Sequence, residues 1–468
     1  MTEHSKFGGG ASDTVLHPLV LAVMLVAILL VLVLPRKRAV VPFLLSVFFV
    51  PLGQQVVFGS LHFFVLRIII LAGCCRLIAS HYCSGDELFA GGFTALDKIF
   101  IGWAISRAMC FVLLYQETSA LINQFGLLID ALGGYFVLRY LIRDIEDTGL
   151  TVKVLATVAF TLGLCMTYEH FGNHNLFGIL GGVGEIPAVR EGKIRCQGVF
   201  QHAIIAGVFG GTLVPMFLWL WKNQSRKLLA VMGIAGAVTM VLMSASSTPV
   251  LALLAGSIGL VLWPLRARMR SIRWGIVLSL VVLALVMKAP VWFVIAHVDL
   301  VGGSSGYQRA LLVDQFIRHF SDWWLLGAPN NGDWGWDMWD VQNQFVAEGE
   351  VGGLMTFGLF IALVCNVFSR LGKTRQLMAG RYEEWFIWTL GAVMFAHVAA
   401  FFGANYFDQI RIWWYAFLAI VAAVTASAAD VFVPSTSGPV QYTGSELDFS
   451  TAGLGGHRPA ADPMFPSF

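Results

Sequence analysis

Apolar residues in this chain gather into long runs separated by short polar stretches. The runs are about 17 to 25 residues long, which is the length that an α-helix needs to cross a bilayer. They lie near 17–35, 40–58, 61–80, 96–115, 119–142, 151–168, 200–221, 228–244, 248–264, 274–296, 351–369, 385–403 and 411–429. The pattern predicts an all-α transmembrane bundle of about 12 to 13 spans.

The composition supports a membrane protein rather than a soluble one. Hydrophobic residues make up 57% of the 468 residues and charged residues 12%, whereas soluble proteins have about 25% charged residues. The formal net charge of +2 gives no sign of a nucleic-acid partner. We expect one bundle over 1–430 and a disordered cytoplasmic tail over 431–468, where Ser, Gly, Pro and Thr are frequent.

Short loops with excess Lys and Arg predict which end of the bundle faces the cytoplasm. If the helices alternate, the following basic residues share one end: Arg36, Lys37, Arg38, Arg139, Arg143, Lys222, Arg226, Lys227, Arg266, Arg268, Arg270, Arg273, Arg370, Lys373, Arg375 and Arg381. The opposite, outer end then carries segment 169–199, a long loop over 297–350 and the turn before Arg411. We expect catalysis or binding in the loop, because loops of this length without low complexity are usually functional.

Tryptophans are frequent in the outer loop. Trp323 and Trp324 fit anchors at the membrane–water interface, where indole rings are enriched. Trp334, Trp336 and Trp339 alternate with acids and fit a carbohydrate-facing surface about as well.

Lys and Arg are expected mainly at the cytoplasmic end, yet six of them lie at the outer end. These six are the candidate ligand-binding residues: Arg190, Lys193, Arg195, Arg309, Arg318 and Arg411. Guanidinium groups match phosphate oxygens in pairs, so their convergence at a membrane surface favours a lipid-linked diphosphate as ligand. The alternative is that each pairs with a nearby acid such as Asp314 or Asp408.

Other polar residues within or beside the apolar runs have structural interpretations. Arg67 and Asp130 lie in different runs and are expected to form an ion pair between helices, since either charge alone in lipid is costly. His202, at the start of a run, is equally compatible with a packing role and with a role as a base.

Three motifs, in this order, resemble the O-antigen ligase and O-antigen polymerase superfamily of bacterial membrane glycosyltransferases. They are RCQGVFQHAIIAG from Arg195 to Gly207, GYQRALL around Arg309, and DVQNQFVAEGEVGGL from Asp340 to Leu354. The resemblance covers about residues 151–430, and the order and spacing of the motifs support it more than any one of them.

The resemblance implies a GT-C type enzyme in the bacterial inner membrane with its active face in the periplasm. Such an enzyme transfers a glycan, with inversion, from an undecaprenyl-diphosphate-linked oligosaccharide to an acceptor glycan, and it needs no metal or other cofactor. Further partners would be membrane lipid and the proteins of polysaccharide export or chain-length control. By this resemblance, Arg195 and Arg309 hold the diphosphate. The further substrate-binding candidates are His202, Gln342, Asn343, Arg318, Arg411 and Trp336.

One position departs from the family pattern. The family's catalytic histidine corresponds to Gln342, followed by the matching Asn343, and glutamine cannot act as a base near neutral pH. Asp340, Glu348, Glu350, His202 and His319 are the possible replacements, of which we favour Asp340 and Glu350. With Arg309 these two acids form the predicted catalytic set.

Several functions stay open at this point. A polymerase of exopolysaccharide or O-antigen type is favoured over a ligase that transfers glycan to a lipid or protein acceptor. A transporter of lipid-linked or anionic substrates would also explain the outer cations together with Arg107 and Lys288, but the sequence lacks the internal repeat typical of many transporters. A structural scaffold would leave the outer acids and arginines unexplained.

Overall fold

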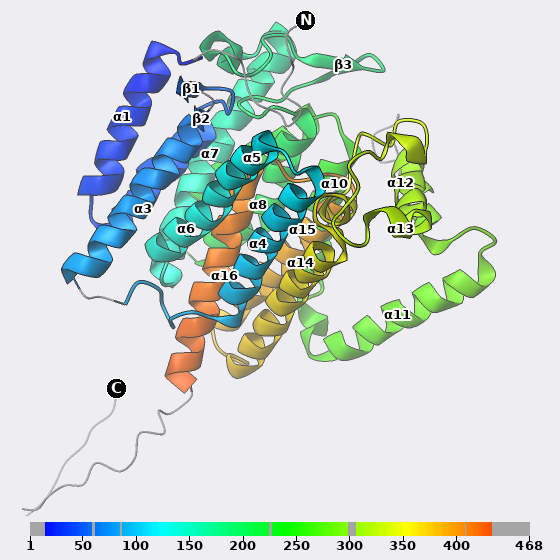
Figure 1. Cartoon of the computed structure of the whole chain (residues 1–468). Helices are drawn as coiled ribbons and strands as arrows, with labels where there is room; N and C mark the ends of the chain where they lie inside the picture. Colours follow the sequence, from blue (N-terminus) through cyan, green and yellow to red (C-terminus); the bar gives the residue numbers. More distant parts are fainter. Residues whose placement is uncertain are drawn as a thin grey trace, which may run out of the picture. The chain divides into compact units, whose positions relative to one another are not determined.

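The computed structural model describes residues 15–58, 61–84, 87–223, 227–297, 306–407 and 409–432. In these residues the chain is almost entirely helical, with two short antiparallel hairpins (Figure 1). The all-α class predicted from the sequence is confirmed. The tail predicted to be disordered lies outside the described residues from 433 onward, as do Asp408 and residues 298–305 of the outer loop.

The elements have the following bounds. The α-helices are α1 (Pro18–Val33), α2 (Arg36–Phe49), α3 (Val65–Ser84), α4 (Ala95–Tyr115), α5 (Thr118–Leu128), α6 (Gly134–Leu141), α7 (Ile145–Gly172), α8 (Ala203–Asn223), α9 (Lys227–Met243), α10 (Ser247–Val261), α11 (Met269–Val286), α12 (Gly306–Arg318), α13 (Phe320–Trp323), α14 (Gln344–Leu377), α15 (Glu383–Phe401) and α16 (Ile410–Phe432). A π-helical turn, η1 (Ile129–Gly133), joins α5 to α6, and the 3₁₀ turns are η2 (Leu176–Leu180), η3 (Trp263–Arg268), η4 (Val291–His297) and η5 (Gly332–Trp334). The strands are β1 (Gln55–Phe58), β2 (Leu61–Phe64), β3 (Ala188–Arg190) and β4 (Lys193–Arg195).

Within the described ranges, eight helical segments are long and apolar enough to cross a membrane, and α1, α9, α10 and residues 410–426 of α16 are shorter apolar helices. The polytopic character is therefore confirmed, whereas the number of spans stays a prediction. Two of the predicted runs end early. The run over 40–58 ends as helix at Phe49, just before Pro51, and its last residues pair as β1 with β2. The run over 274–296 ends as helix at Val286, and Pro290 precedes η4.

The bundle is held together by close helix packing around α8 and α16. α8 packs against α9, α10 and α15, and α9 packs in turn against α7. Small residues allow the closest approach, because a Cβ added to Gly163 on α7 would lie 2.8 Å from the Cα of Gly236 on α9. The predicted ion pair between Arg67 and Asp130 is confirmed, with Arg67 Nε and Nη2 donating to the two carboxylate oxygens at 2.9 and 2.7 Å.

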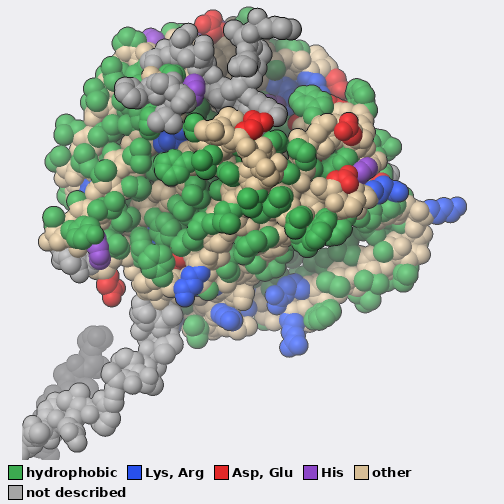
Figure 2. Space-filling view, in the orientation of Figure 1, with side chains coloured by type: hydrophobic (Ala, Val, Ile, Leu, Met, Phe, Trp, Pro, Cys, Tyr) green, Lys and Arg blue, Asp and Glu red, His purple; other side chains and the backbone are tan. Residues whose placement is uncertain are grey.

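The surface follows the expected division between a membrane-facing band and polar ends. Figure 2 shows hydrophobic side chains over the middle of the visible face and basic side chains gathered along its lower edge. At that end Arg36 Nη1 donates to Asp147 at 2.7 Å, and Arg266 and Arg375 both contact Glu384. We refer to the opposite end, where the 306–343 segment lies, as the outer end.

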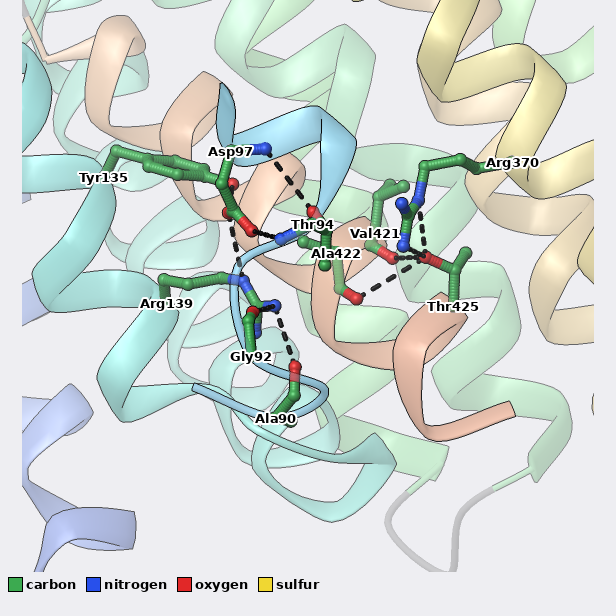
Figure 3. Close-up of polar contacts among 10 residues, drawn as sticks. All are labelled: Ala90, Gly92, Thr94, Asp97, Tyr135, Arg139, Arg370, Val421, Ala422 and Thr425. Atoms are coloured by element: carbon green, nitrogen blue, oxygen red, sulfur yellow. Dashed lines mark hydrogen bonds and ion pairs between the residues drawn. The ribbon is translucent and has the colours of Figure 1, made fainter. Parts of the chain in front are cut away.

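One basic residue assigned to the loops is instead buried. Arg139 is fully inaccessible and its Nε lies 3.4 Å from Asp97 Oδ1, while its Nη2 donates to the carbonyl of Ala90 at 2.9 Å (Figure 3). Asp97 also accepts hydrogen bonds from the Tyr135 hydroxyl at 2.5 Å and from the Thr94 N–H at 2.6 Å. These contacts join the segment before α4 to α6. Arg139 therefore stabilises the fold, and it is not one of the exposed basic loop residues that predict which end faces the cytoplasm.

Candidate functional site

The described part of the outer loop folds around its own small core. The core contains Leu312, Phe316, Trp323, Trp334, Met338 and Val346. The rings of Phe316 and Trp323 stack with centroids 4.0 Å apart, and the Trp323 Nε1–H donates to the carbonyl of Phe316 at 2.7 Å. This small apolar core therefore holds the polar residues of the loop in place.

This core changes the interpretation of three aromatic residues. Trp323 is 3% exposed and Trp334 is 5% exposed, so the first is no interfacial anchor and the second faces no carbohydrate. Trp334 stacks on His319, whose Nδ1 contacts the carbonyl of Gln315 at 3.0 Å, which makes His319 part of the support rather than a free base. Trp336 and Trp339 are strongly exposed, as a sugar-stacking surface requires.

The hairpin β3–β4 places two arginines at the outer end. Its turn consists of Glu191 and Gly192, both with positive φ, at 52° and 74°, a conformation for which glycine is well suited. Arg190 ends β3 and Arg195 ends β4. Arg190 and Arg195 therefore lie on the same short β-hairpin, whose tight turn fixes the positions of its two strands.

The segment that follows Arg195 is anchored by residues that the sequence analysis did not single out. Glu169, fully buried near the end of α7, accepts hydrogen bonds from the N–H groups of Gln197 and Gly198 at 3.0 and 2.8 Å. Asn175 donates from its side chain to the carbonyl of Gly198 at 2.8 Å. A buried carboxylate near the end of an apolar helix is the signal that could have identified Glu169.

Arg309 on α12 joins Arg190 and Arg195 to form what we call the arginine cluster. Burial, together with the charges of Arg190 and Arg195 and against the opposing charge of Asp340, lowers the pKa of Arg309 to about 10. Burial, and then the charge of Arg190, also lower the pKa of Arg195. A pKa of about 10 leaves Arg309 charged at neutral pH, so three positive charges act on one another with one carboxylate beside them.

Two guanidinium nitrogens of this cluster lack a hydrogen-bond partner. The Nε atoms of Arg195 and Arg309 are buried, and neither has an acceptor within the described part of the chain. A buried donor without an acceptor costs free energy, and more so when it carries charge. An anion placed against both arginines would supply the missing acceptors.

Gln342 connects Arg309 to Asp340. Its Oε1 accepts from Arg309 Nη2 at 3.4 Å, and its Nε2 donates to Asp340 Oδ2. The backbone N–H of Gln342 also donates to the carbonyl of Asp340 at 3.0 Å. The residue at the family's histidine position therefore orients a carboxylate next to the buried arginine.

His202 lies beside this group, just before α8. Partial desolvation and then the charge of Arg195 lower its pKa below the ordinary value, and Asp340 opposes them. Its ring centroid is 6.5 Å from that of Phe407, in the turn before α16. His202 therefore borders the cluster, and its role in binding substrate stays a prediction.

Asn343 and Glu350, the next two predicted site residues, are engaged in the fold. Asn343 caps α14, because its Oδ1 accepts from the N–H groups of Phe345 and Val346 at 2.9 and 3.2 Å. Glu350 Oε1 accepts from Asn331 Nδ2 at 3.0 Å, and the Glu350 carbonyl accepts from the N–H of Ala328 at 2.8 Å. These contacts place Glu350 in the support of the outer loop, and none of them joins it to the arginine cluster.

The other predicted residues lie in three different surroundings. Arg318 Nε contacts Asp314 at 2.7 Å one turn earlier on α12, and its side chain is 65% exposed. Arg411 Nε donates to the carbonyl of Tyr406 at 3.0 Å and lines a separate pocket. Trp336 is 84% exposed, and its carbonyl accepts from the side chain of Gln308, the neighbour of Arg309, at 3.0 Å.

Comparison of the chain with family models, with curated proteins and with solved structures finds no match. Among the described residues, no group of three or more His, Cys, Asp or Glu side chains is arranged to hold a metal ion. The functional interpretation therefore depends on the geometry of the site and on the motifs in the sequence.

Proposed function

We propose that this protein is a membrane glycosyltransferase that takes a glycan from a polyprenyl-diphosphate carrier and transfers it to an acceptor glycan. The observation that carries the proposal is the arginine cluster at the outer end of an apolar bundle. Three guanidinium groups from two segments over 100 residues apart in the sequence act on one another there, and two of their buried nitrogens have no acceptor among the described residues. A diphosphate attached to lipid satisfies this charge and these donors at a membrane surface.

In the proposed reaction, an acceptor hydroxyl attacks the anomeric carbon on the side opposite the diphosphate. The new bond joins the acceptor oxygen to that carbon, the bond from the carbon to the diphosphate oxygen breaks, and the configuration inverts. Arg195 and Arg309 stabilise the negative charge that grows on the departing diphosphate. The Asp340 carboxylate, oriented by Gln342, accepts the hydroxyl proton.

The motifs that resemble the O-antigen ligase and polymerase superfamily supply the class of donor and the expected location. We place the protein in a bacterial inner membrane with the arginine cluster in the periplasm. A polymerase is the form we favour, with ligase-type transfer to a lipid or protein acceptor as the alternative. One argument for a transporter was the charge of Arg107 within the membrane. This argument is weaker now, because Arg107 is paired with Glu348 at 2.8 Å.

The experiment that tests this proposal is to identify what accumulates on the lipid carrier in cells of the source organism that lack the protein. Mass spectrometry of extracted polyprenyl diphosphates should show single oligosaccharide repeat units for a polymerase. Finished chains on the carrier would instead identify a ligase. An unchanged carrier pool and normal surface glycan would contradict both.

The two candidate acids can be separated by isosteric amide substitutions. Asp340→Asn should lower the transfer rate by about 10² to 10³, because it removes the proton acceptor while keeping the shape of the side chain. Glu350→Gln should keep the rate within about threefold, because Gln can still accept the hydrogen bond from Asn331. Initial rates of the purified variants in lipid nanodiscs with extracted lipid-linked oligosaccharide provide the measurement. A reversed ranking would move the catalytic role to Glu350.

A further inference from the structure

A second polar site lies inside the bundle. It is a partly open pocket between α4, α5, η1 and α16, closed by the start of α14 and the end of α15. Seven polar or charged residues line it: Arg107, Gln124, Gln344, Glu348, Tyr406, Arg411 and Tyr415. Its other walls include the apolar side chains of Trp103, Leu127, Leu128, Phe360, Phe401 and Trp414.

The pocket lies toward the outer end of the bundle. α4 ends at Tyr115, whose hydroxyl donates to the carbonyl of Pro329 in the outer loop at 3.2 Å. Arg107 is two helical turns before this end, which is about 12 Å along the axis. The pocket and the arginine cluster meet at the start of α14, where Gln342 contacts Arg309 and Gln344 contacts Glu348.

The charge of Glu348 is fully compensated within the pocket. Its buried carboxylate accepts from Arg107 Nη1 at 2.8 Å, from Trp103 Nε1 at 2.9 Å and from Gln344 Nε2 at 2.6 Å. Its negative charge is therefore neutralised by Arg107, and three of its approximately four acceptor sites are occupied.

Among the residues that the structure describes, Arg411 is the cation of the pocket without an ion pair. Its Nε donates to a backbone carbonyl, and it forms no ion pair with any residue that the structure describes. Asp130, whose charge acts on the pocket residue Tyr415, is paired through both oxygens with Arg67. A half-buried guanidinium in an apolar surrounding is costly, and in membrane proteins such a group pairs with an opposite charge or with backbone carbonyls, or marks the path of a ligand.

We infer that this pocket binds the phosphate group of a lipid, with the phosphate against the guanidinium of Arg411 and the hydrocarbon chain along the apolar walls. Basic pockets between membrane helices recognise lipid headgroups in this way. The inference goes beyond the proposed function, because it adds a second anion site that does not use Arg195 or Arg309. The phosphate can belong to an isoprenoid carrier or to a phospholipid, since the chemistry is the same.

The test is a binding measurement on the purified full-length protein in detergent with three probes: farnesyl phosphate, dihexanoyl phosphatidic acid and inorganic phosphate. We expect at least one lipid phosphate to bind, and Arg411→Gln to weaken it by about tenfold or more. Inorganic phosphate should bind far more weakly, because it has no hydrocarbon chain. Tighter binding of farnesyl phosphate would identify an isoprenoid ligand, and tighter binding of phosphatidic acid a phospholipid.

Further variants separate this inference from loss of folding and from the proposed function. Ala108→Phe keeps every charge but fills part of the pocket, so it should weaken the same probe, whereas Arg318→Gln removes an exposed arginine elsewhere and should not. Arg309→Ala should keep the binding even if it abolishes transfer. Equal affinity of wild type, Arg411→Gln and Ala108→Phe for both lipid phosphates would overturn the inference.

Discussion

Arg309→Ala is expected to lower the rate of glycan transfer by a factor on the order of 10² or more. Arg309 is 8% exposed and lies next to Asp340 and Arg195, so no solvent cation can replace the charge that it presents to the departing diphosphate. Arg309→Lys should restore only part of the rate, because an ammonium group cannot bind two phosphate oxygens in the planar geometry of a guanidinium. The measurement is the initial rate of purified protein in nanodiscs.

The matched control for this prediction is Arg318→Ala on the same helix. Arg318 is exposed and already paired with Asp314, so its loss should change the rate by less than about threefold. Equal losses for the two variants would mean that the arginine cluster has no special role and that only the net charge of the outer loop matters.

The second large effect is expected on stability, at the end of the bundle opposite the site. Asp97→Ala would leave the fully buried Arg139 without its carboxylate, and it would also remove an acceptor from Tyr135 and from the Thr94 N–H (Figure 3). Removing one partner of a buried ion pair costs about 3 to 5 kcal/mol. The apparent unfolding temperature in detergent should fall strongly, together with the yield of folded protein.

Lys98→Ala is the control, since Lys98 follows Asp97 on α4 but is exposed. It should leave the unfolding temperature close to that of wild type. If Asp97→Ala were equally harmless, the ion pair with Arg139 would make no net contribution to the fold.

The sequence was most informative where one physical requirement dominates. A bilayer imposes a minimum length on each apolar run, so most helices could be located, although α14 extends seven residues before and eight residues after its predicted run and two runs end early near Pro51 and Pro290. The pair of Arg67 and Asp130 could also be predicted, because two opposite charges in separate apolar runs are each too costly alone. Arg195 and Arg309 were expected to converge; in the structure the charge of Arg195 acts on Arg309, and their joint role in binding stays a prediction.

The rest depended on contacts between distant segments. Nothing in the local sequence indicates that Arg411 lines a separate pocket or that Glu350 accepts a hydrogen bond from Asn331. The pairing of Arg318 with Asp314, four residues earlier on the same helix, was instead among the alternatives that the sequence offered. The tryptophans illustrate the same limit, because Trp334 and Trp336 are only two residues apart and yet one is buried and the other exposed. Composition identifies which residues are unusual, and only the fold decides which of them share a site.

The most direct test of the central claim is the affinity of the purified protein for farnesyl diphosphate, measured in an Arg411→Gln background so that the inner pocket contributes little. If Arg195 and Arg309 bind one diphosphate between them, replacing either by Ala should weaken the affinity by about tenfold or more. An affinity that stays unchanged when either arginine is replaced would contradict the account.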